Sequence, residues 1–296
     1  SISSGVMMLI SLSERFSEII NLEGHPSHWP DSDAKVWSVW GEDSQRTAYV
    51  AEYGNIPLVA SSPEEAVAES DLVFVITRHA DPHPGLARHA ILAGKPVFVD
   101  KPLAQTPGQA RELLNLVNKA NVPMTSFSTL RYASDIVRYK SKLLENGPNQ
   151  YALYVGPAVR SSSRGGLISY GIHTAEVMLE CHGDDIKLIH AVEHPLDAEE
   201  SNVTVTCSYA DDSIVTLALL SNSKSGWHML GIGSGGTVDV PLETHDFYPM
   251  GVRRVLSVLR GRDEGPPAEQ MLRSIQLFAA IEESLQSGKA VDPRIF

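Results

Sequence analysis

Two stretches of the sequence carry residues whose types and positions could do chemistry, and the first surrounds Lys101. Residues 97–104 read Val-Phe-Val-Asp-Lys-Pro-Leu-Ala, an apolar strand that runs into a charged pair. Proline has no N–H for a sheet and restricts the residue before it, so the strand must end there. Lys101 is then presented at the carboxyl end of a strand, the edge at which open parallel α/β sheets bind ligands. The alternative is a solvated Asp-Lys pair at an ordinary strand end.

The second stretch, residues 164–176, reads Arg-Gly-Gly-Leu-Ile-Ser-Tyr-Gly-Ile-His-Thr-Ala-Glu. Its three glycines bracket an apolar patch and predict a helix start close to another surface, with His173 in the first turn. A histidine alone would be read as a cap or a core residue. Together with a lysine it suits alcohol–ketone interconversion. Histidine takes the hydroxyl proton near neutral pH, while Lys101 stabilises charge on the oxygen or, if burial lowers its pKa, shares the proton transfer.

Both stretches resemble motifs of the Gfo/Idh/MocA oxidoreductases, the glucose–fructose oxidoreductase and inositol dehydrogenase family. Residues 97–104 resemble the segment (V/I)-x-x-E-K-P-(L/M)-A, with Asp100 in place of glutamate. Residues 164–176 resemble the helix D-x-G-x-H-x-x-D, with Ser169 and Glu176 in place of the aspartates. The resemblance extends from about Ala34 to the C-terminus.

The resemblance implies that Lys101 and His173 are catalytic, that they come from different domains, and that they converge at the domain boundary. In the family the first carboxylate of the helix motif lies in the substrate pocket. Because Ser169 replaces it here, the substrate class stays open.

The resemblance also implies a nicotinamide cofactor. Residues 77–83, Thr-Arg-His-Ala-Asp-Pro-His, resemble the family's T-P-N-x-x-H loop under the cofactor, agreeing at Thr77 and His83. Glu42 stands near the end of the second strand, where it would repel a 2′-phosphate and so favours NAD over NADP, whereas Arg46 would do the opposite. The candidate cofactor-binding residues are Gly5, Glu42, Thr77, His79, His83, Asp100, Lys101 and Pro102.

Candidate substrate-binding residues follow the last strand of the first half and surround His173. They are Arg131, Tyr132, Tyr170 and Glu176. For Arg131, Tyr132 and Tyr170 the alternative is an ordinary exposed polar residue. The histidines at 79, 83 and 89 could suggest a metal, but Pro82 and Pro84 prevent a shared helical face and no carboxylate cluster completes a site, so no metal is predicted.

The order of predicted elements indicates the fold class. From residue 34 to 127, strands alternate with single helices, which predicts right-handed crossovers and a doubly wound, Rossmann-like parallel sheet. After residue 127 the pattern changes to strands with one wet face and a few helices. We therefore predict an α/β Rossmann-like domain at 1–127 and, at 128–296, an α+β substrate and oligomerisation domain with a mostly antiparallel open sheet.

The start of the chain departs from this pattern. A Rossmann domain opens with an apolar strand and a G-x-G-x-x-G turn, whereas residues 4–22 predict a helix, and only Gly5 could stand for the last glycine. The first strand and glycine-rich turn are therefore expected to be missing. Either the sequence lacks its first dozen or so residues, which we favour, or it is a divergent member with a damaged cofactor site.

Composition bounds the partners. The chain has 296 residues, 43% of them hydrophobic and 20% charged, with a formal net charge of −12 that argues against nucleic acid. No apolar run is long enough for a membrane helix, and two cysteines without metal or redox spacing suit a reducing compartment, so the default location is cytoplasmic. The weakly polar outer positions of the second sheet predict a homodimer or homotetramer through that sheet, the alternative being a monomer.

These observations favour an NAD(P)-dependent oxidoreductase that acts on the hydroxyl or keto carbon of a sugar, cyclitol or related polyol. A non-catalytic, cofactor- or sugar-sensing regulator on the same fold is the main alternative. A metal-dependent hydrolase that uses the histidines is a third.

Overall fold

The computed structural model describes residues 4–9, 13–30, 33–196, 200–221, 226–243 and 246–296. The chain divides into two compact units. The first comprises Ser1–Ala104, Gly108–Phe127 and Tyr248–Pro266, and the second Gln105–Pro107, Ser128–Phe247 and Pro267–Phe296. Apart from residues 105–107, the chain stays in the first unit up to residue 127 and then passes to the second. It returns to the first unit at residues 248–266, which were predicted to be part of the second domain.

The first unit is built on a parallel sheet with the strand order β3-β2-β1-β4-β5-β6. Its strands are β1 (Ser4–Leu9), β2 (Ala34–Trp40), β3 (Leu58–Val59), β4 (Leu72–Val75), β5 (Val97–Val99) and β6 (Met124–Ser126). Its helices are α1 (Ser13–Ile20), α2 (Ser44–Tyr53), α3 (Pro63–Ala68), α4 (His83–Leu92), α5 (Pro107–Ala120) and most of α8 (Phe247–Leu259). This order is the doubly wound, Rossmann-type arrangement expected from the sequence.

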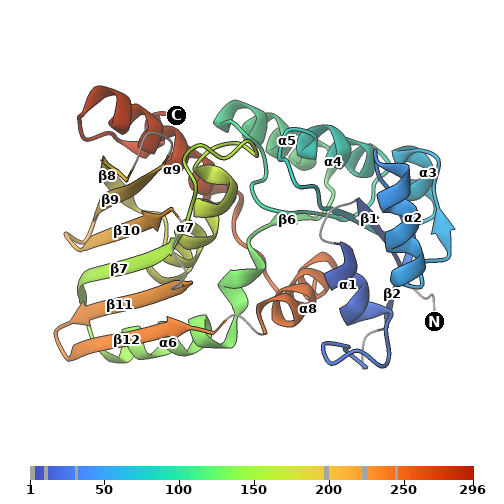
Figure 1. Cartoon of the computed structure of the whole chain (residues 1–296), viewed down its shortest axis with the longest axis horizontal. Helices are drawn as coiled ribbons and strands as arrows, with labels where there is room; N and C mark the ends of the chain where they lie inside the picture. The colour runs from blue at the N-terminus through green and yellow to red at the C-terminus, as the bar shows by residue number, and fades with distance from the viewer. Residues whose placement is uncertain (1–3, 10–12, 31–32, 197–199, 222–225, 244–245) are drawn as a thin grey trace. The chain divides into compact units, whose positions relative to one another are not determined.

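The sheet is covered on both faces because right-handed crossovers lead in opposite directions from its centre. Helices α1 and α8 lie on one face and α4 and α5 on the other (Figure 1). Strand β4 is buried at all four positions, as a central strand must be. On the α1 face, Phe16 packs edge-on against Phe74 at 5.5 Å between ring centroids, and Phe74 continues through Phe98 to Phe127.

The expectation for the start of the chain was wrong. Residues Ser4–Leu9 form β1, which pairs with β2 on one side and β4 on the other, and the helix begins only at Ser13. A short apolar run fits a buried strand and a buried helix equally well, and here the central place in the sheet decided between them. Gly5 pairs with Lys35 inside this strand, so it does not stand for the last glycine of a phosphate-binding turn.

The second unit has a sheet with the order β12-β11-β7-β10-β9-β8, in which only β7 and β10 pair in parallel. Its strands are β7 (Asn149–Pro157), β8 (Ile186–Pro195), β9 (Ser201–Tyr209), β10 (Ile214–Leu220), β11 (Trp227–Gly233) and β12 (Gly236–Leu242). Its helices are the 3-10 turn η1 (Thr129–Tyr132), α6 (Ser134–Glu145), α7 (Ile168–His182), α9 (Ala268–Ser287) and the C-terminal turn η2 (Pro293–Ile295). The mostly antiparallel sheet was predicted, although β8 and β12 were not.

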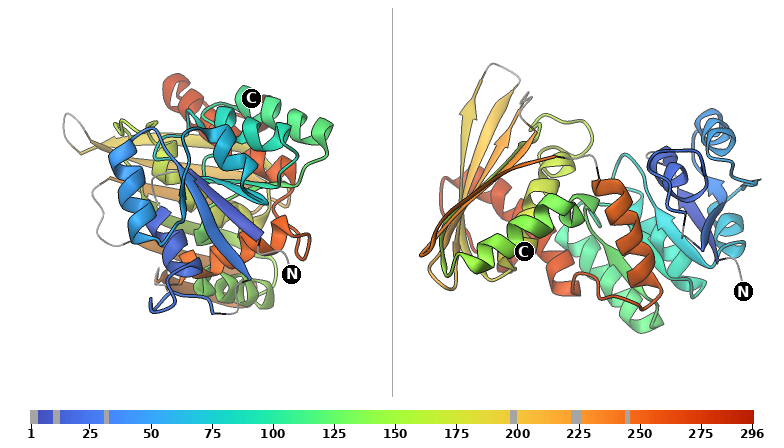
Figure 2. Two further views of the ribbon diagram at one scale, coloured as in Figure 1. Left: turned by 90° about the vertical axis from the view of Figure 1, so that its right-hand side faces the viewer. Right: turned by 90° about the horizontal axis from the view of Figure 1, so that it is seen from below.

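Within this unit, α6, α7 and α9 lie on one face of the sheet, and the other face carries none of the described helices (Figure 2). The register aligns the outward side chains across the strands. Leu153 of β7 lies between Thr216 of β10 and Leu230 of β11, with Tyr151 and Val155 on either side of it along β7. These outward positions are half-buried, whereas the alternate positions are buried against the helices.

Candidate active site

Lys101 is placed by the end of β5, as the sequence predicted. The Asp100 N–H donates to the Val75 carbonyl at 2.8 Å, which joins the ends of β5 and β4. The Asp100 side chain is buried, and this burial raises the pKa of its carboxyl. Lys101 itself is half-buried and is followed by a cis bond to Pro102. The lysine thus follows a well-ordered strand end and is not on a free loop.

His83, the first residue of α4, is tied to this turn. It is fully buried, and its Nδ1 lies 2.7 Å from the Pro102 carbonyl oxygen. A carbonyl oxygen only accepts hydrogen bonds, so Nδ1 must carry the proton. Burial lowers the pKa of His83 to about 4, which keeps the ring neutral at pH 7. His83 therefore supports the turn that carries Lys101.

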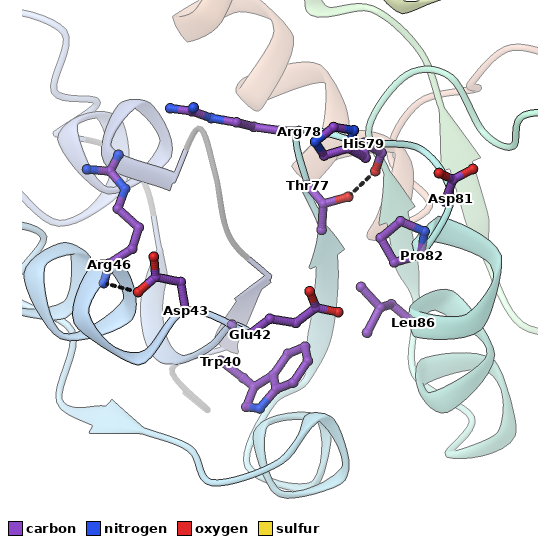
Figure 3. A pocket seen from close by; sticks show the side chains of 11 residues that line it. Trp40, Glu42, Asp43, Arg46, Thr77, Arg78, His79, Asp81, Pro82 and Leu86 are labelled. Atoms are coloured by element: carbon purple, nitrogen blue, oxygen red, sulfur yellow. Dashed lines mark hydrogen bonds between the residues drawn. The ribbon is translucent and has the colours of Figure 1, made fainter. Parts of the chain in front are cut away.

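A cavity of about 740 Å³ opens at the carboxyl ends of β2 and β4 (Figure 3). It lies entirely within the first unit. Carboxyl ends beside the centre of a doubly wound sheet are where such folds bind nucleotides. The lining residues are Trp40, Gly41, Glu42, Asp43, Arg46, Thr77, Arg78, His79, Asp81, Pro82 and Leu86.

The charges on the β2 side of the cavity are arranged around Arg46. Asp43 caps α2 by accepting from the Arg46 N–H at 2.9 Å. The Arg46 guanidinium forms an ion pair of 2.6 Å with Glu14, in the first turn of α1, and lies over the Tyr49 ring. Arg46 is thus engaged within the protein, and the carboxylates that line the cavity are those of Glu42, Asp43 and Asp81.

The cavity fits the adenosine half of a dinucleotide. Trp40, Pro82 and Leu86 would supply the apolar surface for a base, and Glu42 would supply a carboxylate for ribose hydroxyls. The sequence before α1 departs from the usual glycine-rich phosphate-binding pattern. The sequence between β1 and α1 is Ile-Ser-Leu, without glycine, and the first turn of α1 carries Glu14, whose charge Arg46 offsets.

His173 lies in the second unit, in the second turn of α7 and not in its first, because the helix already begins at Ile168. Its Nδ1 is 2.6 Å from the Ser128 hydroxyl oxygen. The Tyr170 ring meets the His173 ring edge-on at 5.0 Å between centroids, and the Trp227 ring does so at 5.9 Å. The hydrogen bond to Ser128 and the two aromatic rings therefore help to hold the imidazole.

A buried ionic network lies beside this histidine. The Ser128 N–H donates to a Glu176 oxygen at 2.6 Å, and Arg131, 2% exposed, forms ion pairs with Glu176 at 3.8 Å and Glu180 at 2.8 Å. The surrounding carboxylates raise the pKa of Arg131 despite its burial. Lys140 completes the network through Glu180 at 2.7 Å. Glu176 thus forms an ion pair with Arg131 and also accepts the Ser128 N–H.

The structure gathers some of the predicted residues and separates others. Glu42, Thr77 and His79 line the cavity, where the Thr77 hydroxyl donates to the His79 carbonyl at 2.5 Å. Asp100, Lys101, Pro102 and His83 form the turn after β5, while Gly5 lies in β1. Around His173, Tyr170 is 45% exposed, Glu176 is buried and Tyr132 is half-buried in η1.

Sequence reasoning missed three contributors. Trp40 is the last residue of β2, and the end of this strand was the predicted ribose site. Its position could therefore have indicated that it lines the cofactor cavity. Ser128 follows β6 in the sequence, and Trp227 begins β11, which is far from α7 in the sequence. Neither residue carries a local pattern that places it against His173.

Among the residues that the structure describes, no three His, Cys, Asp or Glu side chains are grouped so that they could hold a metal ion. The described helices include none with the length and apolar character to cross a membrane.

The fold and the cavity together define a nucleotide-binding Rossmann domain joined to an α+β domain. Residues 18–127 match the family GFO_IDH_MocA, described as an oxidoreductase family with an NAD-binding Rossmann fold. Residues 18–127 thus resemble the NAD-binding Rossmann domain of this oxidoreductase family, as the sequence motifs indicated.

Curated relatives are matched over part of their length. The uncharacterised oxidoreductase YhhX of Escherichia coli is 26% identical over 161 residues, 48% of this chain and 46% of YhhX. YdgJ, an uncharacterised oxidoreductase of the same organism, is 32% identical over 112 residues, 38% of this chain and 32% of YdgJ. The matched regions thus span less than half of these relatives.

Solved structures share the fold over nearly the whole chain. GenD2 from gentamicin A biosynthesis, in complex with NAD, is similar with a TM-score of 0.82 and 20% identity, covering 98% of this chain and 96% of GenD2. Scyllo-inositol dehydrogenase from Lactobacillus casei, with bound NAD(H) and scyllo-inositol, has a TM-score of 0.82 and 15% identity, covering 99% of both chains. At these identities the likeness establishes the fold, and both units take part in it.

Proposed function

We propose that the chain is an NAD-dependent dehydrogenase that interconverts a hydroxyl and a keto group on a sugar, cyclitol or related polyol. The observation that carries the proposal is the combination, in one Rossmann unit, of a cavity suited to adenosine at the ends of β2 and β4 with Lys101 at the end of β5. The match of residues 18–127 to an NAD-binding oxidoreductase family and the NAD complexes of similar structures support it.

In this proposal Lys101 and His173 serve the same reaction. NAD supplies the acceptor for a hydride from the substrate carbon, and the hydroxyl proton must leave at the same time. His173 takes that proton on Nε2, since its Nδ1 is bonded to Ser128. Lys101 donates a hydrogen bond to the substrate oxygen and stabilises the negative charge that develops there. In the reduction direction His173 returns the proton to the substrate oxygen, while Lys101 keeps its hydrogen bond to that oxygen.

NAD is favoured over NADP by the charges of the cavity. Glu42 and Asp43 would repel a 2′-phosphate, and the cation beside them, Arg46, is already paired with Glu14 at 2.6 Å. Arg78 also lines the cavity, and its side chain points from the end of β4 toward the β2 side (Figure 3). We assign Arg78 to the phosphates shared by both cofactors, because the sequence between β1 and α1 has no glycine.

A binding measurement tests this preference. NADH and NADPH are titrated into the protein, with nicotinamide fluorescence as the readout. NADH is expected to bind at least about tenfold more tightly, the scale of one like-charge repulsion of about 1.4 kcal/mol. Glu42→Gln should narrow the gap by weakening NADH and strengthening NADPH. Tighter binding of NADPH to the wild type would overturn the preference.

A ring-shaped polyol is the favoured substrate. Tyr170 and Trp227 stack at 5.8 Å with an angle of 27° and flank the imidazole, which places aromatic faces beside the proposed proton acceptor. The apolar C–H face of a sugar or cyclitol ring suits such a surface, and its hydroxyls suit Lys101 and His173. The similar structures named for inositol dehydrogenases support this class.

The second candidate is a sensor on the same fold that binds cofactor or sugar without turnover. It is favoured by the replacement of the family's motif aspartate by Ser169, whose hydroxyl bonds to Ser162 and Gly166. The two candidates differ in one readout. A dehydrogenase forms NADH with a polyol, whereas a sensor shows binding of NAD or sugar and no NADH with any polyol offered.

A further inference from the structure

Ser128 is a fully buried serine that contacts His173 and Glu176 of the candidate site in the second unit. Its hydroxyl oxygen lies 2.6 Å from His173 Nδ1 and also accepts the Leu130 N–H at 3.2 Å. Its own N–H donates to Glu176 at 2.6 Å, and Glu176 is held in turn by Arg131. Both the backbone and the side chain of Ser128 are therefore fixed before any ligand binds.

We propose that Ser128 is a positioning residue for His173: it holds the imidazole in place and keeps its hydrogen bond while Nε2 gains and loses a proton. This inference rests on the proposed role of His173 in proton transfer. It adds a residue that the resemblance to the family did not indicate, since the relevant motif covers only α7.

The chemistry of a hydroxyl explains the proposal. A hydroxyl can donate one hydrogen bond and accept two. When His173 is protonated or carries its proton on Nδ1, that N–H donates to Ser128 Oγ, which has a second acceptor site for Leu130. When the neutral ring carries its proton on Nε2, the Ser128 O–H rotates to donate to Nδ1. A carboxylate in this place accepts only, and would hold the proton on Nδ1.

The surroundings leave the imidazole few other orientations. Tyr170 and Trp227 pack edge-on against the ring at angles of 73° and 80°, so rotation about its bond to Cβ would meet an aromatic face. Gly156 makes room for Trp227, because a Cβ at that position would lie 2.8 Å from the indole ring. The ring plane is thus set by packing, and the hydrogen bond to Ser128 fixes the side on which Nδ1 lies.

The test compares Ser128→Ala and Ser128→Thr with a matched control, Ser274→Ala. Ser274 is 2% exposed, and its hydroxyl donates to the Met271 carbonyl at 2.9 Å within α9. Thermal unfolding of all variants establishes that they are folded. Histidine tautomers are read by nitrogen-15 NMR on labelled protein, with the His173 signals identified by their loss in His173→Asn.

We expect Ser128→Ala to lower kcat about tenfold to a hundredfold in both reaction directions, the scale of a misplaced catalytic group, with KM and NADH binding nearly unchanged. The His173 signals should shift toward a different tautomer ratio. Ser128→Thr keeps the hydroxyl and should restore kcat to within about threefold of the wild type, and Ser274→Ala should change neither readout.

Two results would overturn the inference. One is an unchanged His173 tautomer ratio in Ser128→Ala, which NMR shows even if no substrate is turned over. The other is Ser128→Thr behaving like Ser128→Ala, which would make the role one of packing. Failure of the proposed function looks different: His173→Asn would then leave turnover intact, or the wild type would form no NADH.

Discussion

At the scale of single residues, His83 supports the turn that carries Lys101, the lysine of the proposed reaction. The His83 ring bonds the carbonyl of Pro102, directly after the lysine, and its lowered pKa means that this bond persists without a change of charge near neutral pH. A charged imidazole at this place would repel the Lys101 ammonium. The neutral ring therefore supports the lysine turn without opposing its charge.

Two histidines with lowered pKa values, the buried His83 and the half-buried His182, predict how stability depends on pH. Burial lowers the pKa of His83 and of His182 to about 4, against 6.5 in an unfolded chain. Between these values the unfolded chain binds more protons, so the free energy of unfolding falls as the pH drops from about 6.5 to about 4. For each histidine the slope approaches about 1.4 kcal/mol per pH unit between these values. Below about pH 4 both states are protonated, so the slope from these histidines returns to zero.

His182→Phe isolates one of these contributions. Phenylalanine keeps the edge-on packing against Tyr154 at 5.5 Å and cannot be protonated. Denaturant unfolding at several pH values should show a shallower loss of stability from pH 6.5 to 4 in this variant. His194→Phe, at an exposed position of β8, is the control and should retain the wild-type slope. An unchanged slope in His182→Phe would contradict the assignment.

At the scale of elements, α3 shows a local signal that the structure confirms. The sequence Ser62-Pro63-Glu64-Glu65 has the pattern of a helix cap, and the Ser62 hydroxyl accepts the Glu65 N–H at 3.2 Å with Pro63 at the first helical position. The Glu65 carboxylate accepts from Ser61, one residue before the cap, at 2.6 Å. Ser62→Ala should lower the free energy of unfolding by about 1 kcal/mol, measured by denaturant unfolding. Ser61→Ala, just before the cap, separates the cap from the Ser61–Glu65 contact, and equal stability of Ser62→Ala and wild type would contradict the cap's role.

Elements were predictable where local chemistry decides them. Caps, glycine stops and fully apolar strands gave the alternating elements from β2 to β6. Strand β1 was misread because its apolar run carries no turn signal before α1, and only pairing with β2 and β4 identifies it as a strand. Strand β8 mixes charged and apolar residues and lies at the edge of the sheet. Its extended conformation therefore depends on pairing with β9, which its own sequence does not indicate.

The candidate site was predictable to the same degree. Lys101, Glu42 and His173 follow from strand ends and a motif, and the structure places the first two at strand ends. Ser128 and Trp227 reach His173 only through the packing of η1 and β11 against α7, which no local pattern encodes. The residues that orient a catalytic group are thus harder to predict than the group itself.

At the scale of the whole molecule, the open face of the second sheet predicts assembly. Leu153, Val155, Leu230 and Ile232 are half-buried on a face that no described helix covers (Figure 2), and two copies of this chain could bury that face against each other about a twofold axis. We therefore propose a homodimer or homotetramer built on this sheet.

Light scattering at micromolar concentration tests the assembly. The wild type should have a mass of at least twice 32.2 kDa, and Leu153→Lys or Leu220→Lys should reduce it by placing a charge in the interface. Lys119→Ala, on exposed α5, is the control. A wild-type mass near that of one chain would contradict the prediction, and a dimer that both lysine variants leave intact would place the interface elsewhere.

The most direct test of the central claim is the formation of NADH fluorescence when the wild-type protein and NAD are mixed with sugars and inositols. The wild type should form NADH with at least one of them, and Lys101→Ala should lower kcat at least about a hundredfold while the affinity for NADH stays within a few fold. Lys119→Ala should match the wild type. Equal turnover by Lys101→Ala and wild type, or NADH binding without turnover of any polyol, would contradict the account.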